Sequence, residues 1–193
     1  VKRPAAAGST NVPPATTKGP GRACQADLKV RLYELFHLLR VDDGDAIAAI
    51  RDRIDGSPGE AMTRILRSIG DVATTAPDSY EGTMQWTVRE QVRFMAALGN
   101  GRVVSPRASA FLLQQMQPIP SQRWGLGAIG ARAFKPGWVS AQTETRQMGI
   151  VGDHAVAIIT AGDGPATIQS DGDYAHAWQL DRLARLLAER IGR

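Results

Sequence analysis

The sequence of 193 residues contains one cysteine, Cys24, and this scarcity limits the chemistry that sulfur can perform in it. A single thiol forms no disulfide within the chain, and it excludes a metal cluster held by several cysteine sulfurs. Long apolar runs are also missing, since none approaches the roughly 20 residues of a membrane-spanning helix. Residues 1–17 hold too few large apolar side chains for the core of a signal peptide. The remaining composition, 43% hydrophobic and 22% charged, is typical of one globular domain.

Acidic residues are missing from a long central segment. Between residues 91 and 143 there is no Asp or Glu, whereas the same segment contains several basic residues: Arg93, Arg102, Arg107, Arg123, Arg132 and Lys135. If this segment folds near one surface, that surface attracts carboxylates. The net charge of +4 is spread too evenly along the chain for a basic tail, so we expect no nucleic-acid partner.

A serine placed three positions before a lysine is absent as well. None of the lysines has this neighbour: Lys2, Lys18, Lys29 and Lys135. The pair of a serine nucleophile and the lysine that activates it is therefore not present within these 193 residues.

The chain divides into a short segment with little to bury and a longer one with regular patterns. Residues 1–24 are rich in Pro, Ala and Gly, which predicts a flexible linker. Residues 25–193 form the expected domain. Its first part is helical: apolar residues recur at helical spacing over 26–40, and capping residues precede three further helical patterns, at Ser57, Thr87 and Ser105.

Beyond Trp124 the pattern changes from helical to extended. We expect three strands, over 131–134, 144–151 and 154–161, with Gly152 and Asp153 forming a tight turn between the last two. The last strand is a continuous apolar run, which indicates that both faces of the sheet are covered. A final amphipathic helix is expected over 174–191. Trp86 and Trp178 are expected in the core, and His154 and His176 at the surface.

Three short stretches carry a resemblance to a known family: Gln122-Arg123-Trp124-Gly125-Leu126-Gly127, Phe134-Lys135-Pro136-Gly137-Trp138 and Arg146-Gln147-Met148-Gly149-Ile150. Together they resemble the C-terminal part of actinobacterial β-lactamase-like serine hydrolases, in the superfamily of penicillin-binding proteins and class A β-lactamases. The resemblance covers roughly residues 40–190. It implies an α/β (α+β) fold in which a helical region precedes an antiparallel sheet and a C-terminal helix. The N-terminal strands of the superfamily are expected to be missing from this chain.

The resemblance also implies candidate site residues. Lys135-Pro136-Gly137 stands where the superfamily has Lys-Thr-Gly on an edge strand, so Lys135 is expected to fix a substrate carboxylate, and Pro136 departs from the usual hydroxyl residue. Trp124, Gly137 and Trp138 are the further substrate-binding candidates. Val41-Asp42-Asp43 resembles Ser-Asp-Asn, which makes Asp43 a catalytic candidate. The alternative for Asp42 and Asp43 is structural, because acidic residues in the first turn complement the positive end of a helix.

The missing nucleophile leaves several interpretations open. Lys2-Arg3-Pro4 would be the tail of the family's Ser-x-x-Lys-x-Pro motif if the serine preceded Val1, and Lys2 would then be catalytic. Alternatively, Ser9 to Pro13 is an eroded version of the motif, or the whole segment is an unrelated linker.

Three functions follow from these interpretations. The domain is an active serine hydrolase with an upstream nucleophile, a degenerate relative that binds without turnover, or a structural module with the same fold. We expect a small-molecule or peptidoglycan-peptide ligand, no cofactor, no metal, no integral membrane segment and a monomer. By resemblance, the location is extracytoplasmic.

Overall fold

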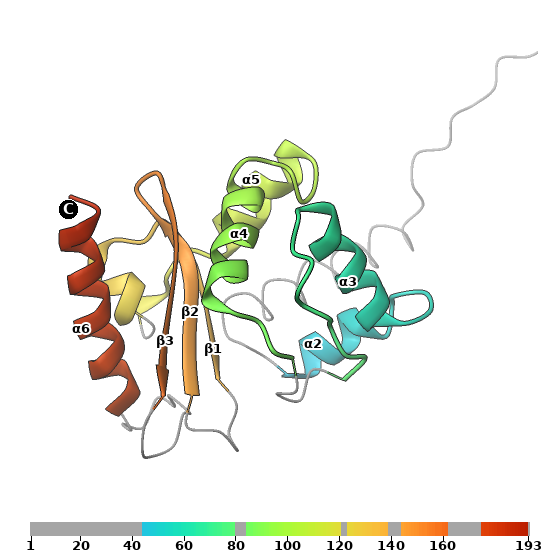
Figure 1. Cartoon of the computed structure of the whole chain (residues 1–193), viewed down its shortest axis with the longest axis horizontal. Helices are drawn as coiled ribbons and strands as arrows, with labels where there is room; N and C mark the ends of the chain where they lie inside the picture. The colour runs from blue at the N-terminus through green and yellow to red at the C-terminus, as the bar shows by residue number, and fades with distance from the viewer. Residues whose placement is uncertain (1–43, 80–83, 121–122, 139–143, 162–174, 193) are drawn as a thin grey trace, which may run out of the picture.

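The computed structural model describes residues 44–79, 84–120, 123–138, 144–161 and 175–192. In chain order these residues form α2 (Gly44–Arg51), α3 (Pro58–Ser68), α4 (Val88–Gly99), α5 (Pro106–Gln115), the short 3-10 helix η2 (Gly125–Ile129), β1 (Ala133–Trp138), β2 (Glu144–Val151), β3 (His154–Ala161) and α6 (Ala175–Arg190) (Figure 1). The predicted order of helical region, sheet and final helix is confirmed. The predicted helix over 26–40 and the expected absence of N-terminal strands lie outside the described residues.

The three strands form an antiparallel sheet in the order β1, β2, β3. The predicted bounds of β2 and β3 are confirmed, and Gly152 makes the turn between them with a φ of +58°. The predicted bounds of the first strand were wrong, because β1 begins at Ala133 and continues through Pro136 to Trp138. Proline is tolerated there because β1 lies at an edge of the described sheet, where a missing N–H need not cost a ladder hydrogen bond.

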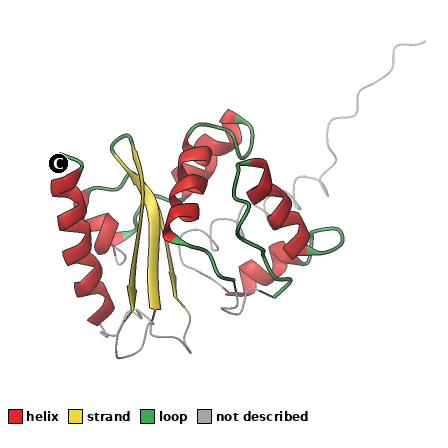
Figure 2. Cartoon of the chain, viewed as in Figure 1, coloured by secondary structure: helices red, strands yellow, loops and turns green. Residues whose placement is uncertain are grey.

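Helices cover both faces of the sheet, as predicted. Figures 1 and 2 show α6 on one side of the strands and α4 with α5 on the other, while α2 and α3 lie beyond α4. The core on the α6 side includes Trp124, Leu126, Phe134, Val156 and Leu180. The core on the α4 side includes Met95, Leu98, Leu113, Ala133 and Ile150.

Local capping explains where the helices begin. The hydroxyl oxygens of Ser57 and Thr87 accept hydrogen bonds from the backbone N–H groups three residues later, at 3.0 and 3.3 Å. Ser105 does the same for α5 at 3.3 Å. Each bond satisfies one of the donors that a first helical turn leaves without a partner. The caps predicted from the sequence are therefore confirmed.

Three sequence predictions were wrong. The segment after Trp124 is the 3-10 helix η2 before it becomes a strand. Trp178 lies on the outer side of α6 and is 64% exposed, so it is not a core residue. His176 is 1% exposed rather than at the surface, because its Nδ1 lies 3.1 Å from the hydroxyl oxygens of both Thr145 and Thr160. Those hydroxyl groups on β2 and β3 give the buried imidazole its polar partners.

Candidate binding site on the edge strand

The backbone of β1 turns alternate residues toward β2 and toward the outer edge of the sheet. The N–H of Phe134 donates to the carbonyl oxygen of Met116 at 2.8 Å, so Phe134 faces outward. Because antiparallel pairing alternates along a strand, Pro136 and Trp138 also turn their backbone groups outward. Lys135 and Gly137 turn theirs toward β2, opposite Met148 and Arg146.

Pro136 limits what this outer edge offers to a ligand. Its nitrogen carries no hydrogen, and its carbonyl oxygen accepts a hydrogen bond from Nζ of Lys135 at 2.7 Å. The next residue whose backbone faces outward is Trp138, which pairs with Thr145 of β2 on the other side. A ligand strand along this edge would therefore find its first backbone donor at Trp138.

The side chains of Lys135 and Arg146 lie on the same face of the sheet. Side chains alternate along β1, so Lys135 and Gly137 share the face of Ala133, which packs toward α4 and α5. Arg146 stands directly opposite Gly137 and shares that face. A Cβ atom built on Gly137 would meet nothing within 4 Å, so there is space between the two cationic residues.

Arg146 is the functional candidate that the sequence analysis missed. It forms an ion pair with Glu144 and donates from Nη1 to the carbonyl oxygen of Trp86 at 3.2 Å, which fixes it near the start of α4. The sequence places Arg146 within a strand but not opposite Gly137, because that register depends on the connection between β1 and β2. Its position within one of the three resembling stretches was the available signal.

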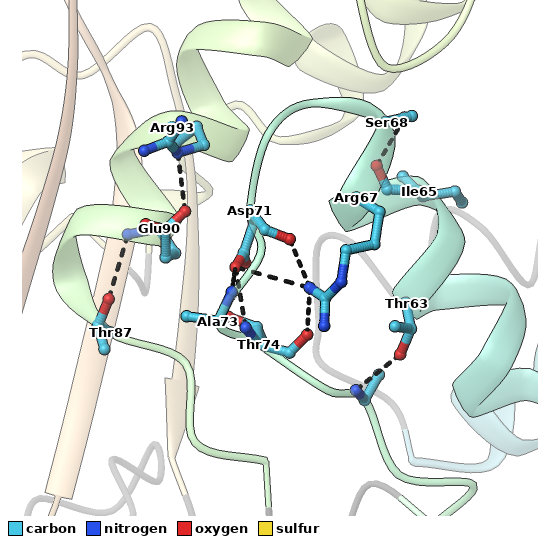
Figure 3. Close-up of polar contacts among 11 residues, drawn as sticks. Thr63, Ile65, Arg67, Ser68, Asp71, Ala73, Thr74, Thr87, Glu90 and Arg93 are labelled. Atoms are coloured by element: carbon cyan, nitrogen blue, oxygen red, sulfur yellow. Dashed lines mark hydrogen bonds and ion pairs between the residues drawn. The ribbon is translucent and has the colours of Figure 1, made fainter.

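A buried polar cluster forms at the end of α3, next to α4 (Figure 3). Asp71 is fully buried, and its Oδ1 accepts from the backbone N–H groups of Ala73 and Thr74 at 3.0 and 2.9 Å. The guanidinium of Arg67 donates to the carbonyl oxygens of Asp71 and Thr74, the latter at 2.7 Å. Burial alone would raise the pKa of Asp71, but the Thr74 side chain, these N–H groups and Arg67 together hold the pKa below its ordinary value.

The same region joins α3 to α4. On α4, Arg93 and Glu90 form an ion pair with 2.8 Å between Nε and Oε2 (Figure 3). A Cβ atom on Gly70, at the end of α3, would lie 3.1 Å from Nη1 of Arg93, so the two elements are in contact. These contacts position α4, whose first turn follows Trp86 and therefore adjoins the candidate site.

The stretch from Trp124 to Gly127 is structural. Trp124 is 8% exposed and packs in the core on the α6 side. Gln147 of β2 accepts from the N–H of Leu126 at 2.7 Å and donates to the carbonyl oxygen of Trp124 at 3.1 Å. Asp181 of α6 accepts from the N–H of Gly125. This stretch therefore joins η2, the sheet and α6, and its burial does not favour ligand contact by the Trp124 ring.

The other predicted site residues are only partly covered by the structure. Lys2 and Asp43 lie outside the described residues, as does Val41. The structure describes the backbone of Trp138 as the last residue of β1. In the described part of the chain, no group of three or more His, Cys, Asp or Glu side chains is placed to hold a metal ion. Within the same residues, no helix has the length and apolarity needed to cross a bilayer.

Comparison with known proteins gives structural neighbours. No protein-family model and no curated protein sequence matches the chain. The solved structure of PBP-A matches with a TM-score of 0.64 at 19% identity, over 84% of this chain and 61% of that one. A variant of PBP-A, solved as an acyl-enzyme complex with penicillin G, matches equally, with a TM-score of 0.64. The chromosome-encoded β-lactamase of Vibrio parahaemolyticus matches with a TM-score of 0.62 at 17% identity, over 83% of this chain and 65% of that one.

The chain has the β-lactamase and penicillin-binding-protein fold. This agrees with the resemblance carried by the three short sequence stretches. The chain spans 61% of the length of PBP-A and 65% of the length of the Vibrio enzyme. At these identities the likeness establishes the fold, and the site has to be argued from the residues of this chain.

Proposed function

We propose that this domain binds small carboxylate ligands of the β-lactam or peptidoglycan-peptide type along the outer edge of β1. One observation carries the proposal: Lys135 and Arg146 flank the open position of Gly137 on one face of an edge strand. The fold supports it, since PBP-A has been solved as an acyl-enzyme complex with penicillin G. Such ligands combine a carboxylate with an amide, and the site offers a partner for each.

The two cationic residues would bind the ligand carboxylate. Lysine binds a carboxylate as a point charge, whereas arginine presents a planar fork of donors. The outward N–H of Trp138 would donate to the ligand amide, as in other complexes where an extended ligand is added to a sheet edge. The Trp138 ring is proposed to contact the body of the ligand. Trp124 would support β1 from the core behind it.

We propose binding without turnover for the residues of this chain. In acyl transfer, the nucleophile and its base act as a unit, and removing one member removes most of the rate. The sequence contains no serine three positions before a lysine, so neither Lys2 nor Asp43 has that nucleophile beside it in a motif. A binding role at the cell envelope, outside the cytoplasm, would suit a ligand of the peptidoglycan type. We propose that the domain acts there as a monomer.

Isothermal titration with penicillin G and with diacetyl-Lys-D-Ala-D-Ala tests the proposal. Replacing Lys135 or Arg146 by Ala should weaken binding by about 10- to 100-fold, because a charge-assisted hydrogen bond is worth about 1.5–3 kcal/mol. Arg185→Ala is the matched control, since this residue is exposed on α6 on the other side of the sheet. Equal affinity in all three variants would remove Lys135 and Arg146 from the site. Intact-mass measurement after incubation should show no acylated protein, and a stable mass increase would contradict binding without turnover.

A further inference from the structure

A pocket of about 540 Å³ lies at the opposite end of β1 from the candidate site. It is formed by the C-terminal turn of α4, one side of α5 and the start of β1, and its walls include Gly99, Asn100, Ser109, Leu113, Gln117 and Arg132. All of these residues belong to the described part of the chain. A pocket of this volume falls within the range of small-molecule sites.

Arg132 is the one charged residue among those that form the pocket. Its Nε donates to the carbonyl oxygen of Gly152 at 3.3 Å, which holds the side chain at the hairpin end of the sheet. Across the described residues, its two terminal nitrogens have neither a hydrogen-bond nor an ion-pair partner. Because residues 91–143 contain no Asp or Glu, the neighbouring chain segments do not neutralise this charge. The pocket is therefore suited to an anion.

Ser109 provides a second, independent observation. It borders the pocket on α5 and is 3% exposed, yet its hydroxyl has no hydrogen-bond partner within the part of the protein that the structure describes. A buried hydroxyl without a partner destabilises the protein, and a polar group that enters the pocket would remove that cost. The unsatisfied hydroxyl thus favours a ligand that carries a hydrogen-bonding group in addition to its charge.

The remaining surface of the pocket is mixed. Leu113, Pro106 and Ala133 supply apolar contacts. Asn100 donates from Nδ2 to the carbonyl oxygen of Ala96 at 2.9 Å, which fixes its amide at the end of α4. A ligand with a short apolar body, one carboxylate and one amide would match this surface better than an inorganic anion would.

We infer that this pocket binds a small organic carboxylate at a site separate from the outer edge of β1. The carboxylate would lie on the guanidinium of Arg132, the apolar body against Leu113 and the polar group near Ser109. Arg132 and Gly137 are five residues apart along an extended strand, a separation of about 17 Å. A small ligand cannot span both positions, so the two sites can be tested independently.

Saturation-transfer NMR on the full chain, with N-acetylglycine as the probe and N-acetylglycinamide as its uncharged analogue, tests this inference. N-acetylglycine should show transfer, and the amide should show much less. Arg132→Gln should weaken N-acetylglycine binding by about 5- to 10-fold, whereas Arg107→Gln, on an exposed neighbour outside the pocket, should leave it unchanged. Ala110→Leu should abolish binding, because Ala110 is an exposed wall residue and the larger side chain fills the pocket without entering the core.

Circular dichroism confirms folding of each variant, and Ser109→Ala provides a further check. It should weaken N-acetylglycine binding by about threefold while keeping or raising the melting temperature of the free protein. None of these variants should change penicillin G binding. The inference is overturned if the probe shows no transfer to the folded wild type, if its uncharged analogue binds equally well, or if Ala110→Leu binds the probe normally.

Discussion

At the scale of single residues, the protein keeps carboxylates charged by surrounding them with donors. Asp71 is buried, but two backbone N–H groups and the nearby Arg67 stabilise its ionised form. Asp78 accepts from the hydroxyl of Ser57 at 2.5 Å and from the N–H of Gly59 at 3.0 Å, and these bonds lower its pKa as well. Both carboxylates hold the segment after α3 in place, on the side of α4 that leads to the candidate site.

The lowered pKa of Asp71 predicts a pH dependence of stability. A carboxyl whose pKa is lower in the folded state stabilises the fold fully above its unfolded value, near 3.9, and loses this contribution as the pH falls through its folded value. Asp71→Asn should lower the free energy of unfolding by about 1–3 kcal/mol at pH 7, and the difference from wild type should shrink in acid. Urea denaturation at neutral and acidic pH measures both effects.

Asp55→Asn is the control for this prediction. Asp55 is exposed in the turn between α2 and α3, so the substitution should change stability little at either pH. A stability difference between wild type and Asp71→Asn that stayed constant down to pH 2 would show that charge on Asp71 does not stabilise the fold.

At the scale of elements, one glycine and one glutamine join the 3-10 helix to the sheet. Gly125 has a φ of +59°, and a Cβ atom on it would lie 2.1 Å from Oε1 of Gln147. Gln147 is fully buried and serves both the N–H of Leu126 and the carbonyl oxygen of Trp124. The sequence stretch that carried the resemblance is therefore retained by packing and backbone geometry.

Substitutions at this joint should destabilise the fold strongly. Gly125→Ala should cost about 2–5 kcal/mol, from the left-handed backbone and from displacement of Gln147. Gly56→Ala separates these two causes, because Gly56 has a φ of +79° with open space around it, and it should cost only about 1–2 kcal/mol. Gln147→Ala should cost about 2–4 kcal/mol, since it leaves two buried backbone groups without partners. Thermal and urea unfolding measure these values, and equal costs for the two glycine variants would contradict the packing argument.

The elements that could be predicted from sequence are those set by local chemistry. The caps at Ser57, Thr87 and Ser105 depend on residues three positions apart, and β2 and β3 depend on alternation and a two-residue turn. His176 and Arg146 depend on residues far along the chain. Burial of His176 requires threonines on two strands, and the position of Arg146 requires the register between β1 and β2. The sequence pattern alone does not specify either contact.

At the scale of the whole molecule, the fold places two different environments at the ends of one edge strand. One end has Lys135, Gly137 and Arg146 beside the outward backbone of Trp138. The other end has Arg132 and the pocket between α4 and α5. The resemblance predicted the fold and the edge-strand lysine, whereas the second environment follows only from the way α5 packs beside β1.

Backbone amide NMR during titration with penicillin G tests the central claim most directly, because it locates the ligand without any substitution. We predict that the largest shift changes occur at the amides of Gly137 and Trp138 on β1 and of Arg146 on β2. The amides of α6 should remain unchanged. Saturable shifts confined to other elements, with β1 unaffected, would contradict a binding site on the outer edge of this strand.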